Sequence, residues 1–287
     1  MHSGNGIKTV LVLAALSGLL LLVGDTYGGQ NGLMLALGFA ILMNGGSYFF
    51  SDKIALATSG AQAVTREEAP KLYEVVERLC GKANLPMPKL YVIPEEAPNA
   101  FATGRNPSHA SVAATVGLLR LMNDDELEGV IAHELSHVSN YDILTTSIAA
   151  TIAAAITALA HMARWAMIFG GVRDDDDRRG GGGAISMLLM VILAPLAALI
   201  LQLMISRRRE SAADETGARL VGHPYGLISA LEKLGAYNKQ IPMAASPAAS
   251  SLYIVKPLSG DGFAGLFSTH PPLEERIAAL KQMVITR

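Results

Sequence analysis

The chain has 287 residues, of which 51% are hydrophobic and only 17% are charged, and this composition argues against an ordinary soluble domain. A net charge of −2 excludes the large basic face with which nucleic-acid-binding proteins neutralise phosphates, so we expect no nucleic-acid partner. Cys80 is the only cysteine, which excludes an intrachain disulfide and a cysteine-based metal cluster and fits a reducing compartment.

Four apolar stretches are each long enough to cross a membrane, which takes about 20 residues at a rise of about 1.5 Å per residue. They are 7–23, 33–50, 144–169 and 184–206. The first could also be a secretory signal, but no small-x-small cleavage site follows it and a second apolar stretch comes soon after. We therefore interpret 1–50 as an N-terminal transmembrane hairpin and 144–206 as a second one.

The basic residues predict the orientation of these spans. The short loop Gly24–Gly32 contains no lysine or arginine, which is typical of an outer loop. Basic residues flank the opposite ends of the spans, at Lys8, Lys53, Arg66 and Arg207–Arg209. Both termini and the segment between the second and third spans are therefore predicted to be cytoplasmic, in a multi-pass protein of the inner membrane. The outer loop 171–183 departs from the rule, because it carries three arginines.

The soluble remainder, 51–143 and 207–287, is predicted to form two halves of one domain. A helix is expected from Thr65, where Thr65 and Glu68 form a capping box. Its apolar face consists of Leu72, Val75, Val76 and Leu79. Short strands are expected at 87–94, 99–104 and 109–116, with a turn at 104–107.

Further helices are expected after the strands. Asn123 caps the first of them, and acidic residues fill its first turn, where the helix dipole favours negative charge. Three more are expected at 206–220, 224–234 and 272–283, and the small, polar stretch 244–251 is expected to be a mobile loop.

The helix after Asn123 carries a pattern typical of zinc proteases. His133 and His137 are four residues apart, so their imidazoles lie on one helix face at the spacing that two ligands of one zinc ion need. Glu134 is placed to reach a water molecule on that metal. The competing interpretation is a pair of histidines hydrogen-bonded in a polar core.

A second pattern follows the fourth apolar stretch. Glu210 and Asp214 again share a helix face, and Glu210 can supply the third ligand of a catalytic zinc site. Asp214 can accept a hydrogen bond from the far nitrogen of a ligand histidine and fix its tautomer. Surface carboxylates among arginines are the alternative, and the histidine motif favours the metal site.

Four segments, HELSH, SRRRESAAD, NAFATG and STHPPLEERI, occur in the same order as in HtpX-type membrane zinc proteases, relatives of the CAAX prenyl protease. The resemblance covers nearly the whole chain. It implies a mainly helical α+β fold, with four transmembrane helices and a cytoplasmic gluzincin-type zinc protease domain that contains a small β-sheet. Ser211 departs from the family, which more often has an aromatic residue after the ligand glutamate.

The resemblance also implies roles for individual residues. His133, His137 and Glu210 would bind one Zn²⁺ per chain, a ligand set that also accepts cobalt or manganese. Glu134 would be the general base, with Asp214 supporting a ligand histidine.

Asn99, Ala100 and Phe101 would form an edge strand that pairs with an extended substrate, although the Phe101 side chain better fits a core position. His270 would lie near the metal, unless it caps the helix that follows, and Arg276 would pair with a carboxylate.

The resemblance thus implies an endopeptidase that performs ATP-independent quality control on membrane or misfolded proteins. Two alternatives remain open on the residues alone. An intramembrane zinc protease would place the histidine motif within a span, but the acidic turn after Asn123 argues against this. A non-catalytic metal-binding scaffold or transporter is the other alternative. The sequence does not indicate the oligomeric state.

Overall fold

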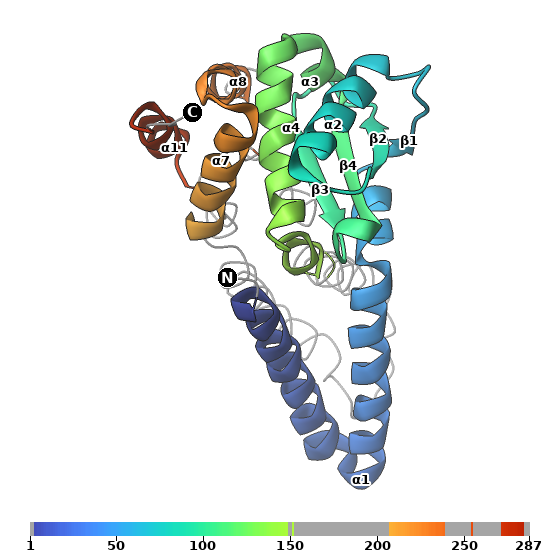
Figure 1. Ribbon diagram of the computed structural model, residues 1–287. Helices are drawn as coiled ribbons and strands as arrows, with labels where there is room; N and C mark the ends of the chain where they lie inside the picture. The colour runs from blue at the N-terminus through green and yellow to red at the C-terminus, as the bar shows by residue number, and fades with distance from the viewer. Residues whose placement is uncertain (1–2, 149–150, 152–206, 239–253, 255–270, 284–287) are drawn as a thin grey trace, which may run out of the picture.

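The computed structural model describes residues 3–148, 151, 207–238, 254 and 271–283. A long helical hairpin carries a compact unit in which the central helix α4 (Asp124–Ser139) lies between a small sheet and a group of C-terminal helices (Figure 1). The residues that the structure describes are mainly helical with one small mixed sheet, as the resemblance implies.

The hairpin is formed by α1 (Ser3–Thr58), whose two arms meet at Gly29. Gly29 has φ 54° and ψ −144°, a conformation open to glycine, and this single residue breaks the helical geometry. The predicted loop Gly24–Gly32 is therefore wrong, because the chain stays helical on both sides of the break. The arms approach closely, since a Cβ on Gly24 would lie 2.6 Å from the Gly32 carbonyl oxygen.

The second arm of α1 is longer than predicted. Gly28–Thr58 is long and apolar enough to cross a membrane, and it is the only such helix in the part of the chain that the structure describes. The sequence predicted an end at Phe50, but the helix continues to Thr58 because Ala55 and Leu56 are buried against the sheet. The predicted third and fourth spans lie almost entirely outside the described residues, and so does the expected mobile loop at 244–251.

The sheet has the strand order β1-β2-β4-β3. Its strands are β1 (Gln62–Ala63), β2 (Lys89–Ile93), β3 (Ala100–Gly104) and β4 (Ala110–Thr115), the last preceded by the 3-10 turn η1 (Pro107–His109). β2 and β4 are parallel, while β1 and β3 pair antiparallel to their neighbours. β3 is consequently an edge strand, in agreement with the resemblance.

The two faces of the sheet belong to different cores, because successive side chains of a strand point to opposite sides. Leu90, Val112 and Ala102 align across three strands and join the main core, which also holds the buried face of α2 (Pro70–Ala83). Tyr91, Ala113 and Phe101 align on the other face and pack with the end of α1.

Four further helices complete the described unit: α3 (Val116–Leu121), α7 (Arg207–Val221), α8 (Tyr225–Asn238) and α11 (Leu273–Lys281). α7 and α8 pack against α4, and α11 packs against α7 and α8. The cap predicted at Asn123 is confirmed, because its side chain accepts a hydrogen bond from the Glu126 amide and Glu126 bonds back in return. The helix predicted from Thr65 instead begins at Pro70, although the Thr65 amide does donate to Glu68 at 2.7 Å.

Candidate metal centre

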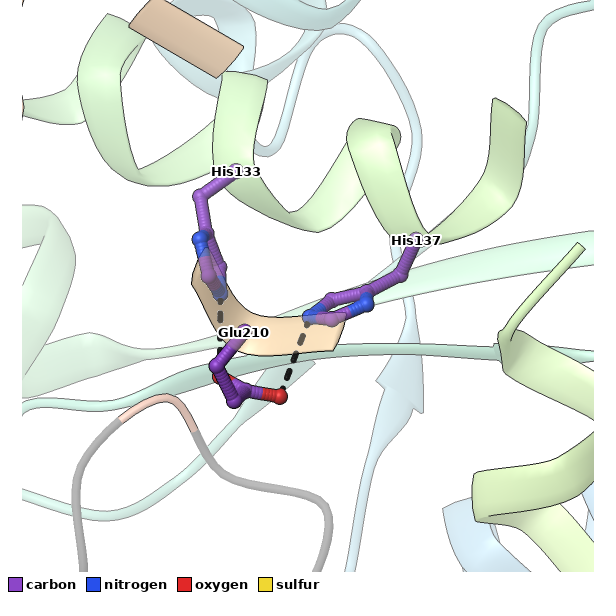
Figure 2. Close-up of side chains that lie close together, drawn as sticks. All are labelled: His133, His137 and Glu210. Atoms are coloured by element: carbon purple, nitrogen blue, oxygen red, sulfur yellow. Dashed lines mark ion pairs between the residues drawn. The ribbon is translucent and has the colours of Figure 1, made fainter. Parts of the chain in front are cut away.

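Two histidines project from the C-terminal half of α4 toward α7. His133 and His137 lie one turn apart, and their rings are 4.9 Å apart and nearly perpendicular. Glu210, in the first turn of α7, lies beneath both rings, with its two carboxylate oxygens directed at different histidines (Figure 2). Residues separated by more than 70 positions are thus brought together because α4 and α7 pack side by side.

The three side chains have the geometry of a metal site. Glu210 Oε2 lies 3.7 Å from His133 Nε2, and Glu210 Oε1 lies 3.6 Å from His137 Nε2. All three ligand atoms lie within 4.8 Å of one another. Ligand atoms held tetrahedrally at about 2.0–2.2 Å from zinc are about 3.3–3.6 Å apart. His133 Nε2 is buried and makes no hydrogen bond within the described residues, so these residues fit a cation at this point.

Glu134 lies beside the histidines and faces β3. Its side chain is buried, and its Oε2 accepts a hydrogen bond from the Ala102 amide at 2.9 Å. Burial raises the pKa of Glu134 to about 8, and the Ala102 hydrogen bond opposes this rise. A carboxylate with a pKa near neutrality, held in one orientation, is suited to accept and return a proton.

Asp214 contacts His133 on the ring nitrogen that faces away from Glu210, and Arg276 pairs with Asp214. Asp214 Oδ1 lies 2.8 Å from His133 Nδ1, while Arg276 binds both carboxylate oxygens of Asp214, at 2.8 and 2.6 Å. Burial raises the pKa of Asp214, but Arg276 and His133 outweigh it and lower the pKa to about 2. Burial lowers the pKa of His133 to about 4. His133 is therefore neutral, with its Nδ1 donating to an ionised Asp214 and its Nε2 available to a metal.

The second histidine lies between two carboxylates. Burial lowers the pKa of His137, but Glu210 and Asp142 more than offset this effect and raise the pKa to about 9. The site therefore favours one positive charge beside Glu210. The sequence did not single out Asp142, whose Oδ2 lies 3.5 Å from His137 Nδ1. Sequence spacing did not predict this contact, because Asp142 lies five residues after His137 and reaches it only through a sharp turn after α4.

Ala100 and Phe101 are the first residues of the edge strand β3, and Asn99 directly precedes it; none of the three contributes a side chain to the three-residue cluster. Asn99 is buried, and its side chain accepts from the Ala100 amide. Phe101 is fully buried in the core beside α1.

The outward edge of β3 already carries hydrogen bonds, since the Ala100 carbonyl accepts from the Ile254 amide at 3.2 Å and the Ala102 amide donates to Glu134.

The other predicted residues have different outcomes. Arg276 pairs with a carboxylate, as expected, and that carboxylate is Asp214. Ser211 donates to the Arg207 carbonyl oxygen on the exposed side of α7. His270 lies outside the described residues.

Comparison with known proteins gives consistent results. The family model described as peptidase family M48 matches residues 66–284. A protease HtpX homologue from Desulforapulum autotrophicum is 54% identical over 97% of this chain and 90% of its own length. One from Syntrophobacter fumaroxidans is 52% identical over 98% of this chain and its own entire length. The crystal structure of S. mikatae Ste24p superposes with a TM-score of 0.50 at 18% identity, over 96% of this chain and 65% of that one, which indicates a shared fold.

Proposed function

The chain belongs to peptidase family M48, as a membrane-bound metalloprotease of the HtpX type, and from this membership we propose that it is a zinc endopeptidase with His133, His137 and Glu210 as metal ligands and Glu134 as general base. The observation that carries the proposal is the convergence of three ligand atoms within 4.8 Å, beside a buried carboxylate with a raised pKa. A non-catalytic scaffold or transporter is not favoured, because the relatives are proteases.

Each residue has a distinct task in peptide hydrolysis. When bound, zinc lowers the pKa of a water molecule and polarises the scissile carbonyl. Glu134 accepts the proton of the attacking water and passes it to the leaving amine. Asp214 keeps His133 in the tautomer whose Nε2 faces the ligand cluster, and Arg276 keeps Asp214 ionised. The Ala102 amide holds the Glu134 carboxylate in place throughout.

Substrates would bind as an extended strand along β3, near Asn99 and Ala100, with the Phe101 side chain remaining in the core. The Ala100 carbonyl is bonded to the Ile254 amide, so a substrate strand has to displace this contact to pair there.

His270, within the segment before α11, is proposed to approach the metal or cap that helix. We infer that the substrates are membrane or misfolded proteins, cleaved at the cytoplasmic membrane surface in ATP-independent quality control.

The proposal is tested with detergent-purified protein, by measuring zinc content and cleavage of an unfolded polypeptide such as casein. Wild type is expected to hold about one zinc per chain and to cleave without ATP. Glu134→Gln is expected to retain zinc and to lose at least about 100-fold in activity. Glu210→Ala is expected to lose both. Cleavage by Glu134→Gln at the wild-type rate, or full zinc content in Glu210→Ala, would contradict the assignment.

A further inference from the structure

A tight turn follows α4 and returns the chain to the metal site. The helix ends at Ser139, and Tyr141 then adopts φ 59°, in the left-handed region that non-glycine residues rarely occupy. The turn is closed by a hydrogen bond from the Asp142 amide to the His137 carbonyl oxygen, at 2.9 Å. Strained backbone of this kind concentrates at functional sites, where surrounding contacts hold it in place. Here it places Asp142 against the turn of α4 that carries His137.

The carboxylate of Asp142 reaches the far nitrogen of His137. Asp142 is buried, and its Oδ2 lies 3.5 Å from His137 Nδ1, an atom that is itself buried and makes no hydrogen bond within the described residues. The opposite nitrogen of the same ring faces Glu210. His137 is thus arranged as His133 is, with Glu210 on one nitrogen and an aspartate on the other.

The two histidines are also alike in that an arginine lies near the aspartate of each pair. Arg276 forms an ion pair with Asp214, the carboxylate behind His133. The terminal guanidinium nitrogens of Arg209 are buried near Asp142; burial lowers the pKa of this guanidinium, and Asp142 and Glu210 oppose that change. Each of the two aspartates therefore has an arginine guanidinium nearby.

A metal-bound histidine usually donates its other ring N–H to a carboxylate or carbonyl, which fixes the ring and increases its basicity. We propose that Asp142 is a positioning residue that orients His137 for metal binding, as a second carboxylate–histidine pair beside Asp214 and His133. This inference rests on the proposed role of His137 as a ligand.

A competing role for Asp142 is purely structural. Its carbonyl oxygen accepts from the Thr146 amide at 3.2 Å, so Asp142 also stands at the start of the helical residues 143–148. Aspartate, asparagine and serine all serve well as the first residue of a helix, whereas alanine does not. Serine is too short to reach His137, so Asp142→Ser separates the two roles.

The test compares Asp142→Ser, Asp142→Asn and Asp142→Ala in the full chain, with Asp125→Ser, an exposed carboxylate at the far end of α4, as the matched control. Three quantities are measured: zinc affinity against a competing chelator, the visible spectrum of the Co²⁺ form, and the melting temperature of the metal-free protein.

We expect Asp142→Ser to lose about 10- to 100-fold in zinc affinity and to alter the cobalt spectrum, while its metal-free melting temperature stays near that of wild type. Asp142→Asn, which keeps a neutral acceptor, should lose less, and Asp125→Ser should match wild type.

Wild-type zinc affinity and cobalt spectrum in Asp142→Ser would overturn the proposal, and a loss of stability confined to Asp142→Ala would assign the residue to helix capping alone. In either case zinc binding by wild type and inactivity of Glu134→Gln would leave the protease assignment standing. Failure of wild type to bind zinc would contradict both.

Discussion

At the scale of single residues, the proposed general base Glu134 carries a cost in stability. It is buried beside Glu210, and burial raises its pKa to about 8, from about 4.5 for an exposed glutamate. The folded protein therefore binds an extra proton between these two values. Since stability falls with rising pH wherever the native state binds more protons, Glu134 by itself should make the metal-free protein less stable as the pH rises from about 4.5 to about 8.

Glu134→Gln should remove this loss, because the amide is neutral at every pH and its oxygen can still accept from the Ala102 amide. We expect the metal-free variant to be more stable than wild type by about 2–4 kcal/mol at pH 8 and nearly equal at pH 5, since one unit of pKa shift is worth about 1.4 kcal/mol. Thermal unfolding with a chelator at both pH values measures the difference. A gap that is equal at the two pH values would contradict the expectation.

The control for this prediction is Glu215→Gln. Glu215 is exposed on α7 and pairs with Arg219 at 2.9 Å, one turn along the same helix. Exposed pairs of this kind contribute about 0.3–0.5 kcal/mol. The control should therefore show no comparable gain at pH 8, which separates the burial of Glu134 from a general effect of removing a carboxylate.

Sequence spacing predicted the residues of the site that share a helix face, and it did not reveal those that meet through turns. His133 with His137, and Glu210 with Asp214, are each four residues apart, so one helix aligns each pair. Asp142 reaches His137 only because Tyr141 takes a left-handed conformation, for which a tyrosine gives no warning. Arg276 was expected to pair with a carboxylate, but identifying Asp214 as that carboxylate required the packing of α11 against α7.

At the scale of elements, close backbone approaches set the position of α4. A Cβ on Gly217 of α7 would lie 3.0 Å from the His133 amide nitrogen, and one on Gly129 of α4 would lie 2.5 Å from the Leu227 amide nitrogen of α8. The first contact therefore fixes the distance between the two helices that carry the proposed metal ligands. The second joins α4 to a helix that contributes none of the ligand cluster.

Substituting alanine at the two glycines should separate stability from metal binding. Gly217→Ala is expected to push α7 away from His133 and to lower zinc affinity at least about 10-fold, because Glu210 and Asp214 move with α7. Gly129→Ala is expected to cost about 1–3 kcal/mol of stability through overpacking, with zinc affinity retained in the folded protein. Chelator competition and thermal unfolding measure the two effects. Equal losses of zinc affinity in both variants would refute this division of roles.

Local sequence signals predicted most elements correctly. They failed where the same side-chain hydrogen bond occurs both at a helix start and in an isolated turn. Asn123 and Glu126 cap α4 as expected. Thr65 and Glu68 make one bond of the same box, but in a turn that ends at Ala69. Proline lacks an amide hydrogen and suits the first position of a helix, so Pro70 begins α2.

At the scale of the whole molecule, α1 bears an exposed apolar surface, and aromatic and basic residues lie where this surface ends. Large apolar side chains are exposed along its second arm, at Met34, Leu35, Leu37, Phe39, Ile41 and Leu42. Above them Lys53 lies over the Phe50 ring, and Arg105, just after β3, lies over the Phe49 ring. Aromatic and basic residues of this kind gather at the membrane surface. We predict that these residues lie at the cytoplasmic surface of the membrane, which would bring the end of β3 close to the bilayer.

Cysteine labelling in intact cells tests this orientation, and the chain is well suited to it. Cys80 is buried, and burial raises the pKa of its thiol to about 11, so its background reaction with maleimides should be slow. Gln30→Cys places an exposed thiol at the tip of the α1 hairpin. Glu67→Cys places one in the turn before α2, beyond the other end of the arm Gly28–Thr58. At about 46 Å, this arm is longer than the hydrocarbon layer of about 30 Å, so the two thiols must lie on opposite sides if the helix spans it.

A membrane-impermeant maleimide should label Gln30→Cys in intact cells and Glu67→Cys only after permeabilisation. The reverse pattern would place the metal site outside the cytoplasm, and labelling of both thiols in intact cells would exclude the helix as a span.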